Sequence, residues 1–357
     1  MSRQLPLKGR GAQSNLPNRF LKEVHEKRND FLEYCHQTGE QAETTKTHYL
    51  PVYQKSIVNK VNSPDLGLEY SMNPYQGCEH GCIYCYARNS HEYWGYSAGL
   101  DFEKKILVKK NAPELLEKQL RKKSWQAKTI VLSGNTDCYQ PAEKIFGITR
   151  DCLKVFLKYR HPVGIITKND LILRDLDLLR ELNQNRLVSV HVSITTLSEE
   201  TRRLLEPRTA TIAKRLRIIE KLSGFDIPVH AMLAPIIPGI NSHELLALAK
   251  SCSAHGAYSF GYIVVRLNGA IGTLFTEWIR IALPDRADKV LSQIAACHGG
   301  KLNDSRFGIR GRGEGKLAKQ IQDMARLGRQ KYYANRKPIP LNTELHEAYK
   351  SGQLKLF

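Results

Sequence analysis

Three cysteines with metal-ligand spacing, Cys78, Cys82 and Cys85, form the motif C-x3-C-x2-C. Thiolates are soft ligands that select zinc or iron–sulfur clusters. Gly77 and Gly81 permit the irregular loop that would turn three side chains toward one place. A closed structural zinc site has four ligands, so a set of three indicates a metal position left open for chemistry.

The residues alone leave two other interpretations of this group open. His80 or His91 would complete a four-ligand zinc site, because imidazole and thiolate are both common zinc ligands. The cysteines would otherwise be structural residues that stand together by chance, since free cysteines are often simply buried. Disulfides are not expected, because the other five cysteines are scattered and the chain shows no secretory signal.

A series of short apolar runs, rich in β-branched residues, predicts the strands that position these cysteines. Each run is followed by a polar or Gly/Pro turn and then by a segment of helical period. The runs are Leu68–Ser71 (the weakest), Thr129–Leu132, Val163–Thr167, Leu187–Ile194, Ile227–Leu233 and Tyr258–Val265. Two buried helix stripes are predicted, one with Ile145, Ile148, Cys152, Val155, Phe156 and Tyr159, the other with Ile212, Leu216, Ile219 and Leu222.

Strand–helix units in series imply parallel strands with right-handed crossovers. Six strands are too few for a closed eight-stranded barrel, which leaves a partial barrel or an open doubly wound sheet. In both architectures the functional site lies at the carboxyl ends of the strands. Those ends are rich in polar residues and turns here: NPYQGCEHGCIYC, SGNTDCYQPAE, TKND, SITT, APIIPGIN and RLNGAIG.

The composition is that of an ordinary globular protein, with 357 residues, 41% hydrophobic and 25% charged. No stretch of eighteen apolar residues occurs, so we expect no membrane span, and the N-terminus lacks a signal-like apolar region, so we expect a cytoplasmic protein. The formal net charge is +19, and Arg306–Lys337 holds ten basic and two acidic residues. This concentration fits a nucleic-acid contact surface; a solvated basic face without a partner is the other interpretation.

The cysteine motif resembles the signature of the radical S-adenosylmethionine (SAM) superfamily, C-x3-C-x-aromatic-C, with Tyr84 as the aromatic residue. The resemblance covers about residues 66–283. It implies an α/β fold, a partial (β/α)6 TIM-like barrel, and a [4Fe–4S] cluster held by Cys78, Cys82 and Cys85. SAM would chelate the fourth iron, and an electron from the reduced cluster would cleave it to a 5′-deoxyadenosyl radical that abstracts hydrogen from the substrate.

The same resemblance implies SAM contacts at several strand ends. Tyr84 would pack near the adenine, and Asn135 or Asp137 would replace the family's Gly-Gly-Glu contact to the SAM amine. Asp137 is equally suited to capping a helix. Ser193 and Thr195 would face the ribose or the methionine part, although polar strand ends without such a role are as common.

Two further positions carry an expected SAM contact, and one carries a possible catalytic role. Arg208, in LLEPR, resembles the basic residue that holds the SAM carboxylate; an ion pair with Glu206 is its alternative. Ile236, in the APIIPG turn, would offer backbone atoms to the adenine. The segments TDCYQPAEK and SITT…LEPR are similar to those of the spore photoproduct lyase branch, which reverses a thymine dimer in DNA with a cysteine as hydrogen donor. Cys138 stands in the comparable region and is either such a donor or a buried structural cysteine.

The resemblance divides the chain into a basic N-terminal extension (1–60), a radical SAM core (61–283) and a basic C-terminal region (284–357). A short helix is expected over Arg19–Cys35, and RFGIRGRGEGK is interpreted as a flexible basic loop. The last five residues, Gln353–Phe357 (QLKLF), resemble the bacterial sliding-clamp-binding peptide, an extended segment that docks in a groove.

We therefore expect a radical SAM enzyme that repairs or modifies nucleic acid, DNA rather than RNA. A flavodoxin or ferredoxin would supply the electron, and the sliding clamp is a second expected partner. The alternatives are a radical SAM enzyme that modifies RNA or protein, and a metal-stabilised nucleic-acid-binding protein without catalysis.

Overall fold

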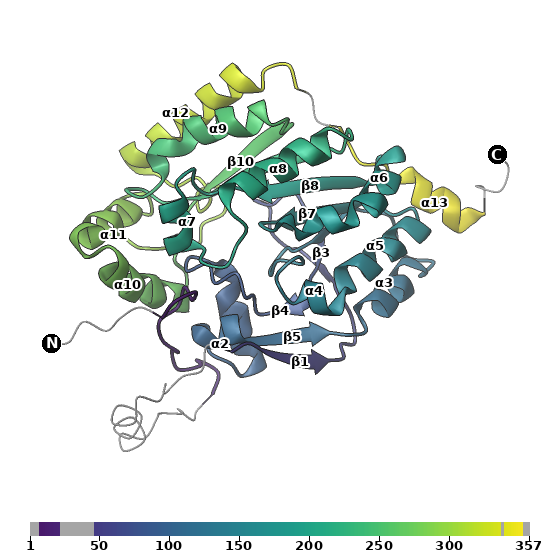
Figure 1. Ribbon diagram of the computed structural model, residues 1–357, viewed down its shortest axis with the longest axis horizontal. Coiled ribbons are helices and arrows are strands. Elements are labelled where there is room, and N and C mark those ends of the chain that lie inside the picture. Colours follow the sequence, from purple (N-terminus) through teal and green to yellow (C-terminus); the bar gives the residue numbers. More distant parts are fainter. Residues whose placement is uncertain (1–6, 22–45, 337–338, 353–357) are drawn as a thin grey trace.

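A computed structural model describes residues 7–21, 46–336 and 339–352 (Figure 1). Its larger sheet has the strand order β10-β9-β8-β7-β6-β3-β2, in which β2 is antiparallel and the others run parallel. The strands are β2 Val58–Lys60, β3 Tyr70–Met72, β6 Ile130–Leu132, β7 Val163–Thr167, β8 Val188–Ser193, β9 Val229–Ile236 and β10 Ser259–Val264. The six predicted parallel strands are confirmed.

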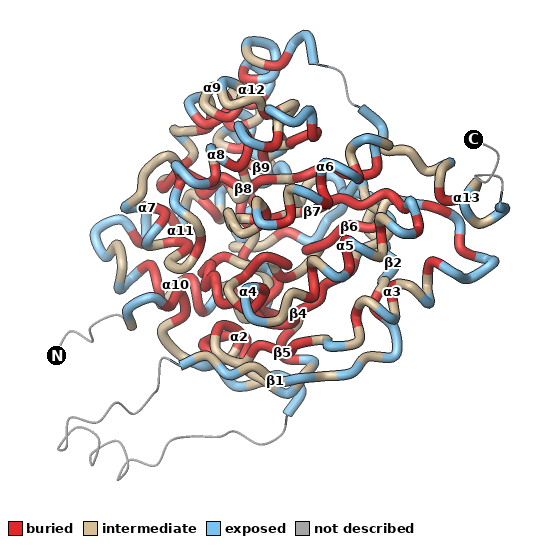
Figure 2. The backbone as a smooth tube through the Cα atoms, turned by 45° about the vertical axis from the view of Figure 1, so that its right-hand side comes forward, coloured by how far each residue is buried: buried red, intermediate tan, exposed pale blue. Residues whose placement is uncertain are grey.

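The two faces of this sheet differ in burial. Figure 2 colours each residue of the chain by how far it is buried. In β8, Val188, Val190 and Val192 are fully buried, whereas Ser189 and His191 between them are half-buried. Successive side chains of a strand point to opposite faces, so one face packs under helices and the other forms the inner face of the curled sheet. A doubly wound sheet has helices on both faces; the fold is instead a partial barrel.

Helices that follow the strands cover the outer face (Figure 1). Helices α6 and α8 contact β8, and α8 and α9 contact β9. The helices are α2 Leu100–Lys104, α3 Ala112–Leu120, α4 Glu143–Phe146, α5 Ile148–Lys158, α6 Leu176–Gln184, α7 Glu199–Leu205, α8 Ile212–Ser223, α9 Leu245–Ala254, α10 Ala270–Ala282, α11 Ala287–Ala296, α12 Gly315–Tyr332 and α13 Glu344–Ser351, with 3-10 segments η1 Tyr86–Trp94, η2 Asp170–Asp175, η3 Ser242–Glu244 and η4 Pro284–Arg286.

One predicted helix stripe is interrupted. Gly147 adopts a left-handed conformation (φ 64°) that separates α4 from α5, a conformation that glycine reaches without steric cost. Ile145, on α4, is 63% exposed, so its prediction as a buried residue is wrong. Cys152 and Phe156 on α5 are fully buried as predicted, and the second stripe coincides with α8.

A smaller sheet of order β1-β5-β4 was not predicted. It consists of β1 His48–Val52, β5 Lys105–Lys109 and β4 Tyr75–Gln76, strands that are short or lie in a segment without a sustained apolar period. Strand β4 leads directly into the cysteine motif, so this sheet holds one end of the loop. Of the helix expected over Arg19–Cys35, residues 22–35 lie outside the described residues, and residues 19–21 are not helical.

Described residues on both sides of the expected core pack into its hydrophobic clusters. Ala12 is fully buried in a cluster with Ile83, and Ile321 of α12 is fully buried in the main core. The hydroxyl of Tyr333 donates to the carbonyl of Ala249 on α9 at 3.0 Å. None of the helices in the described ranges combines the length and apolar character that a membrane span requires.

Candidate active site

The three cysteines lie in one loop between β4 and η1. Cys78 and Cys82 are buried and Cys85 is half-buried. Gly77 (φ 81°) and Gly81 (φ 68°) adopt the left-handed conformation, and a Cβ at Gly77 would lie 2.8 Å from the carbonyl oxygen of Lys105. The tight loop that the two glycines were expected to permit is therefore present.

The donor set of the loop fits a cluster of several irons better than one zinc ion. Within residues 7–21, 46–336 and 339–352, no three His, Cys, Asp or Glu side chains are placed to hold a single metal ion. His80 lies beside Asp137, with Nδ1 3.4 Å from Oδ2, and His91 packs against Phe102 and Tyr96. In a cubane each cysteine binds its own iron, so the thiolates need not meet at one point. The zinc interpretation with a histidine ligand is not supported.

Burial controls the protonation of the three thiols. It raises the pKa of Cys78, Cys82 and Cys85, because the charged thiolate is poorly solvated there. For Cys78 the negative charges of Asp137 and of the other two cysteines raise the pKa further. A bound metal displaces such protons, so iron bound here would have to supply the charge that compensates the buried thiolates.

A buried carboxylate behind the loop, Glu103, joins it to the N-terminal residues. Its Oε1 accepts from the backbone N–H of Ala12 (2.8 Å) and its Oε2 from that of Gly11 (3.1 Å). The same carboxylate forms an ion pair with Arg88, and both side chains are fully buried. Arg88 Nε in turn donates to the carbonyl of Cys82 at 3.0 Å. Glu103 therefore couples the position of the cluster loop to the N-terminal segment.

We call residues 9–15 the N-terminal strap. A Cβ at Gly11 would lie 1.8 Å from the carbonyl oxygen of Gly81, a contact that only glycine avoids. The amide of Leu100 donates to the carbonyl of Ser14 at 3.1 Å, which fixes the end of the strap to α2. This part of the expected N-terminal extension is thus built against the cysteine loop.

We expect Gly11→Ala to lift the strap from the loop. Overpacking of this kind costs roughly 1–3 kcal/mol, which corresponds to an increase of about 5- to 150-fold in the undocked population. Trypsin cleavage at Arg10 or Arg19 under native conditions measures that population. The matched control is Gly67→Ala, where an added Cβ meets nothing within 4 Å. Equal cleavage rates for the two variants would contradict the role assigned to Gly11.

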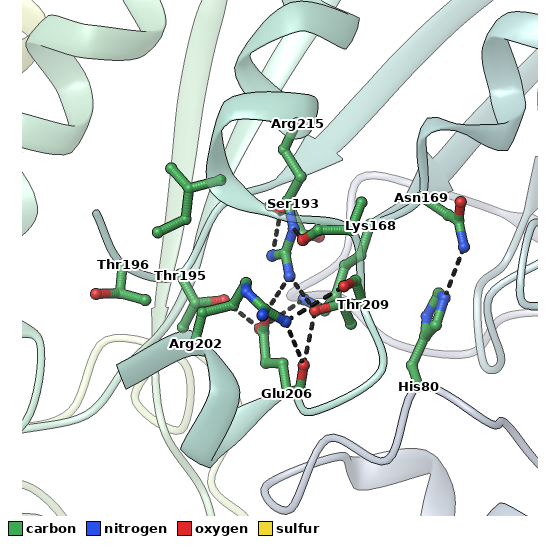
Figure 3. A network of polar contacts seen from close by, with 12 residues as sticks. His80, Lys168, Asn169, Ser193, Thr195, Thr196, Arg202, Glu206, Thr209 and Arg215 are labelled. Atoms are coloured by element: carbon green, nitrogen blue, oxygen red, sulfur yellow. Dashed lines mark hydrogen bonds and ion pairs between the residues drawn. The ribbon is translucent and has the colours of Figure 1, made fainter. Parts of the chain in front are cut away.

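A buried polar network centred on Glu206 lies at the carboxyl end of β8 (Figure 3). Glu206 forms an ion pair with Arg215 of α8, and the side chains are 0% and 1% exposed. Lys168, which follows β7, places its Nζ 3.4 Å from Glu206 Oε1. Burial opposes ionisation of Glu206, but the charges of Arg215 and Lys168 outweigh it and lower the pKa.

Tyr84 and Thr195, two expected SAM contacts, belong to this network. The hydroxyl of Tyr84 donates to Glu206, and Thr195 Oγ1 donates to the same oxygen, Oε1, at 2.5 Å. Burial and the charge of Glu206 raise the pKa of Tyr84, so its proton stays on the phenol. The backbone carbonyl of Ser193 accepts from Arg215 Nη1 at 3.0 Å. Three residues expected near SAM are therefore assembled on one buried ion pair.

Arg208 contacts the cysteine loop rather than Glu206. Its Nη2 lies 3.2 Å from Oε1 of Glu79, a loop residue, and its backbone N–H donates to the carbonyl of His80 at 3.2 Å. The alternative ion pair with Glu206 is wrong, because Arg215 and Lys168 occupy that carboxylate. Arg208 retains a side chain that is 33% exposed, which leaves its guanidinium accessible beside the loop.

Asn135 and Asp137 lie beside the cluster loop but have protein partners. The amide of Asn135 donates to Ser90 Oγ at 2.9 Å. The carboxylate of Asp137 accepts from the backbone N–H of Lys168 (2.8 Å) and from that of Tyr139, two residues on (2.8 Å). Asp137 therefore organises the local backbone, but it does not cap a helix as the alternative expected, because α4 begins after Ala142 without a side-chain cap. The SAM-amine role stays an expectation for both residues.

The other two expected positions are fully buried. Ile236 ends β9, and its carbonyl accepts from the amide of Val265 at 2.9 Å. Cys138 lies in the main core; its amide donates to Ser133 Oγ (2.7 Å) and its carbonyl accepts from Thr149 Oγ1 (2.7 Å). Burial raises the pKa of the Cys138 thiol. This environment favours the structural interpretation of Cys138 over the hydrogen donor.

Sequence reasoning did not identify Lys168, Arg215 or Glu103. One signal was present, because Arg215 interrupts the apolar stripe of α8, and a charge at a core-facing position requires a buried partner. Glu103 gave no comparable signal, since its partners Arg88, Gly11 and Ala12 come from distant segments.

Comparison with known proteins shows the family to which the chain belongs. Residues 72–252 match the radical SAM superfamily. The chain is 35% identical over 237 residues to an uncharacterised protein of Mycobacterium tuberculosis. The aligned region covers 65% of this chain and 69% of that protein. The chain is 31% identical over 203 residues to an uncharacterised protein of Methanocaldococcus jannaschii, which covers 57% of this chain and 73% of that one.

Solved structures of spore photoproduct lyase share the fold. The lyase complexed with dinucleoside spore photoproduct matches with a TM-score of 0.59 and 15% identity, over 85% of this chain and 91% of that chain. A double mutant of that lyase with bound AdoMet and the same dinucleoside matches with a TM-score of 0.58 and 14% identity, over the same shares. The chain therefore belongs to the radical SAM superfamily and is an enzyme of the kind that uses a [4Fe–4S] cluster with S-adenosylmethionine.

Proposed function

We propose that this radical SAM enzyme acts on nucleic acid, DNA rather than RNA, to repair or modify a base. Cys78, Cys82 and Cys85 would hold the cluster, with SAM beside Tyr84, Thr195 and Arg208. A cluster and SAM bound there would supply, on transfer of one electron, methionine and a 5′-deoxyadenosyl radical able to take a hydrogen atom from the substrate. The chain's own residues hold the loop, exclude water and present the substrate.

The observation that carries the substrate assignment is the inner face of β8, β9 and β10. His191 on β8 stands opposite His230 on β9, and the two rings stack with centroids 4.8 Å apart. Burial lowers the pKa of His191 to about 4 and also lowers that of His230, so both are neutral at pH 7. Apart from them, this face presents Ser189, Ser193, Met232, Ala234, Ser259, Gly261 and Ile263.

The named residues of this inner face are polar or apolar but none is charged, which suits the neutral, planar, hydrogen-bonding part of a nucleotide. His191 makes a ring contact but no hydrogen bond among the described residues, so both of its nitrogens are available to a ligand. An added Cβ at Gly261 would meet no atom within 4 Å, which leaves open space over β10. Lyase structures of the same fold hold a dinucleoside, and this supports the same substrate class here.

The test is an anaerobic assay of the protein reconstituted with iron and sulfide, with dithionite as the electron source and SAM. We expect 5′-deoxyadenosine without substrate and more of it with damaged DNA, with a product that mass spectrometry identifies. His191→Ala should reduce the stimulation by DNA, whereas His243→Ala, whose side chain is 72% exposed on η3, should not. Stimulation by RNA or protein but not by DNA would overturn the assignment of DNA as the substrate. Bound zinc without any nucleoside product would favour a binding protein without catalysis.

Three expected features complete the proposal. A flavodoxin or ferredoxin would supply the electron in a cytoplasmic setting. The clamp-like peptide Gln353–Phe357 lies outside the described residues; helix α13 ends just before it, at Ser351. Capture of the sliding clamp by the full chain, but not by a Leu356→Ala/Phe357→Ala variant, is the test of that partner; equal capture by both would reject it.

A further inference from the structure

The basic loop between α11 and α12, residues 304–314, runs beside the edge strand β10. The amide of Val264 on β10 donates to the carbonyl of Gly311 at 2.9 Å. The expected loop RFGIRGRGEGK (306–316) is a loop up to Glu314, and its last two residues, Gly315 and Lys316, begin α12. Arg306 pairs with Asp304 and Glu314, so fewer unpaired guanidinium groups face the solvent than the sequence indicates.

The same loop reaches the other edge of the sheet. The segment 61–69 connects β2, the antiparallel edge strand, to β3, and it carries Asp65. The amide of Gly308 donates to Asp65 Oδ1 at 2.7 Å. Arg310 Nε donates to Asp65 Oδ2, and Arg310 Nη2 donates to Ser63 Oγ at 2.6 Å. These contacts, which we call the Asp65–Arg310 latch, join segments that flank the two edges of the partial barrel.

Asp65 sits in surroundings that would bind any small anion. The Gly308 N–H and the Arg310 guanidinium together lower the pKa of Asp65. A second guanidinium contacts the same loop, because Arg266 Nη1 donates to the carbonyl of Asp304 at 3.2 Å. A backbone N–H combined with arginine is the donor set that proteins use for phosphate as well as carboxylate. Phe307, 57% exposed, lies against the Arg310 guanidinium, 4.3 Å from the ring centroid.

The strength of the latch permits exchange. The side chains of Asp65 and Arg310 are each 20% exposed, and ion pairs near the surface contribute little net stability. A nucleic acid gains by releasing condensed counterions when a guanidinium contacts its phosphates. A phosphate of a polyanion can therefore replace a single carboxylate at this position.

We propose that Asp65 occupies a phosphate-binding position and that a backbone phosphate of the nucleic-acid substrate replaces it at Arg310 and the Gly308 N–H, opening the latch. The chain's own carboxylate thus competes with the substrate and discriminates against weak anions. This inference rests on the proposed nucleic-acid substrate and adds where its backbone binds and what it must displace.

The experiment is fluorescence anisotropy with labelled DNA and RNA oligonucleotides of one sequence, between about 50 and 200 mM salt. Asp65→Asn should bind about two- to fivefold more tightly, because the competing charge is gone. Arg310→Gln should bind more weakly and lower the slope of log affinity against log salt by about one. In the Arg310→Gln background, Asp65→Asn should no longer tighten binding.

Matched variants separate the latch from a general charge effect. Asp288→Asn removes an equal charge from the exposed pair with Arg280 and should leave the affinity unchanged. Ser63→Ala removes a hydrogen bond from Arg310 without a change in charge and should tighten binding. Equal gains for Asp65→Asn with and without Arg310, or no gain at all, would overturn the latch.

Failure of the latch differs visibly from failure of the proposed function. Normal oligonucleotide binding with no effect of Asp65→Asn rejects the latch and leaves the substrate class intact. No binding of DNA or RNA by the wild type or by Asp65→Asn rejects both the latch and the nucleic-acid substrate. Formation of 5′-deoxyadenosine by the wild type without substrate would even then support the enzyme class.

Discussion

Replacing Cys78, Cys82 or Cys85 by alanine is expected to abolish both the cluster and the cleavage of SAM. Each cysteine would bind one iron of the cluster, and among the described residues no group of three His, Cys, Asp or Glu side chains is placed to hold a single metal ion instead. Mutation of residues that merely surround metal ligands typically costs 10–100-fold in affinity or activity, so loss of a ligand should reduce 5′-deoxyadenosine formation by more than about 100-fold. Iron content, the visible spectrum and product formation after anaerobic reconstitution measure the effect.

The matched controls are Cys138→Ala and Cys252→Ala, because both thiols are fully buried but lie outside the loop. They should retain about four irons per chain. Cys138→Ala additionally tests the hydrogen-donor role, since a donor is needed after the cofactor has been cleaved and its loss would change the product. Iron retention by an alanine variant of the loop would contradict the assignment of that cysteine.

Breaking the buried ion pair at the end of β8 should have the largest effect on stability. Arg215→Met leaves the Glu206 carboxylate buried, with Lys168 as its remaining ion-pair partner among the described residues. Removal of one partner of a buried pair typically costs 3–5 kcal/mol, and we expect a decrease of about that size in the free energy of unfolding, measured by urea denaturation. Tyr84 and Thr195 also lose the fixed position of their acceptor, so SAM affinity should fall as well.

Two variants calibrate that measurement. Arg280→Met breaks the exposed pair with Asp288 and should cost less than about 1 kcal/mol. The double variant Arg215→Met/Glu206→Leu should recover part of the loss, because the fully buried carboxylate is gone; Lys168, whose side chain is 16% exposed, then remains without its partner, so the recovery should be incomplete. A decrease of less than about 1 kcal/mol for Arg215→Met would contradict a structural role for the pair.

The same carboxylate gives the stability a defined pH dependence. The pKa of Glu206 in the folded protein lies below its ordinary value of 4.5. Its contribution is therefore fully present above pH 4.5 and is lost as the pH falls below that value. The Arg215→Met/Glu206→Leu variant should show a smaller loss of stability over that acidic range than the wild type.

The sequence predicted a structural feature correctly where all the residues that produce the feature lie in one short segment. The spacing from Cys78 to Cys85 predicts the cluster loop, because the expected ligands and the two permissive glycines all lie in one segment. The parallel strands are recognisable in the sequence because the strands of a covered parallel sheet consist mostly of apolar, β-branched residues. The break at Gly147 was missed, because one glycine inside a helical stripe is compatible with either a continuous or an interrupted helix.

Features that depend on distant partners were beyond the reach of such patterns. Glu206 looked like a partner of Arg208, two residues away, but the fold brings Arg215 and Lys168 to it instead. The basic loop looked like a free cationic surface, yet Asp65 lies against Arg310. The smaller sheet joins β1 to β5, which lie far apart in the chain. The residues of neither strand indicate with which strand it pairs. These pairings follow from tertiary packing rather than local preference.

The N-terminal strap has a consequence for how the metalloprotein matures. Gly11 touches the backbone of Gly81, and the amides of Gly11 and Ala12 donate to Glu103, so this side of the thiol loop is covered once the strap has docked. Inorganic iron and sulfide, or a scaffold that delivers them, must then arrive from the opposite side or act before the strap docks.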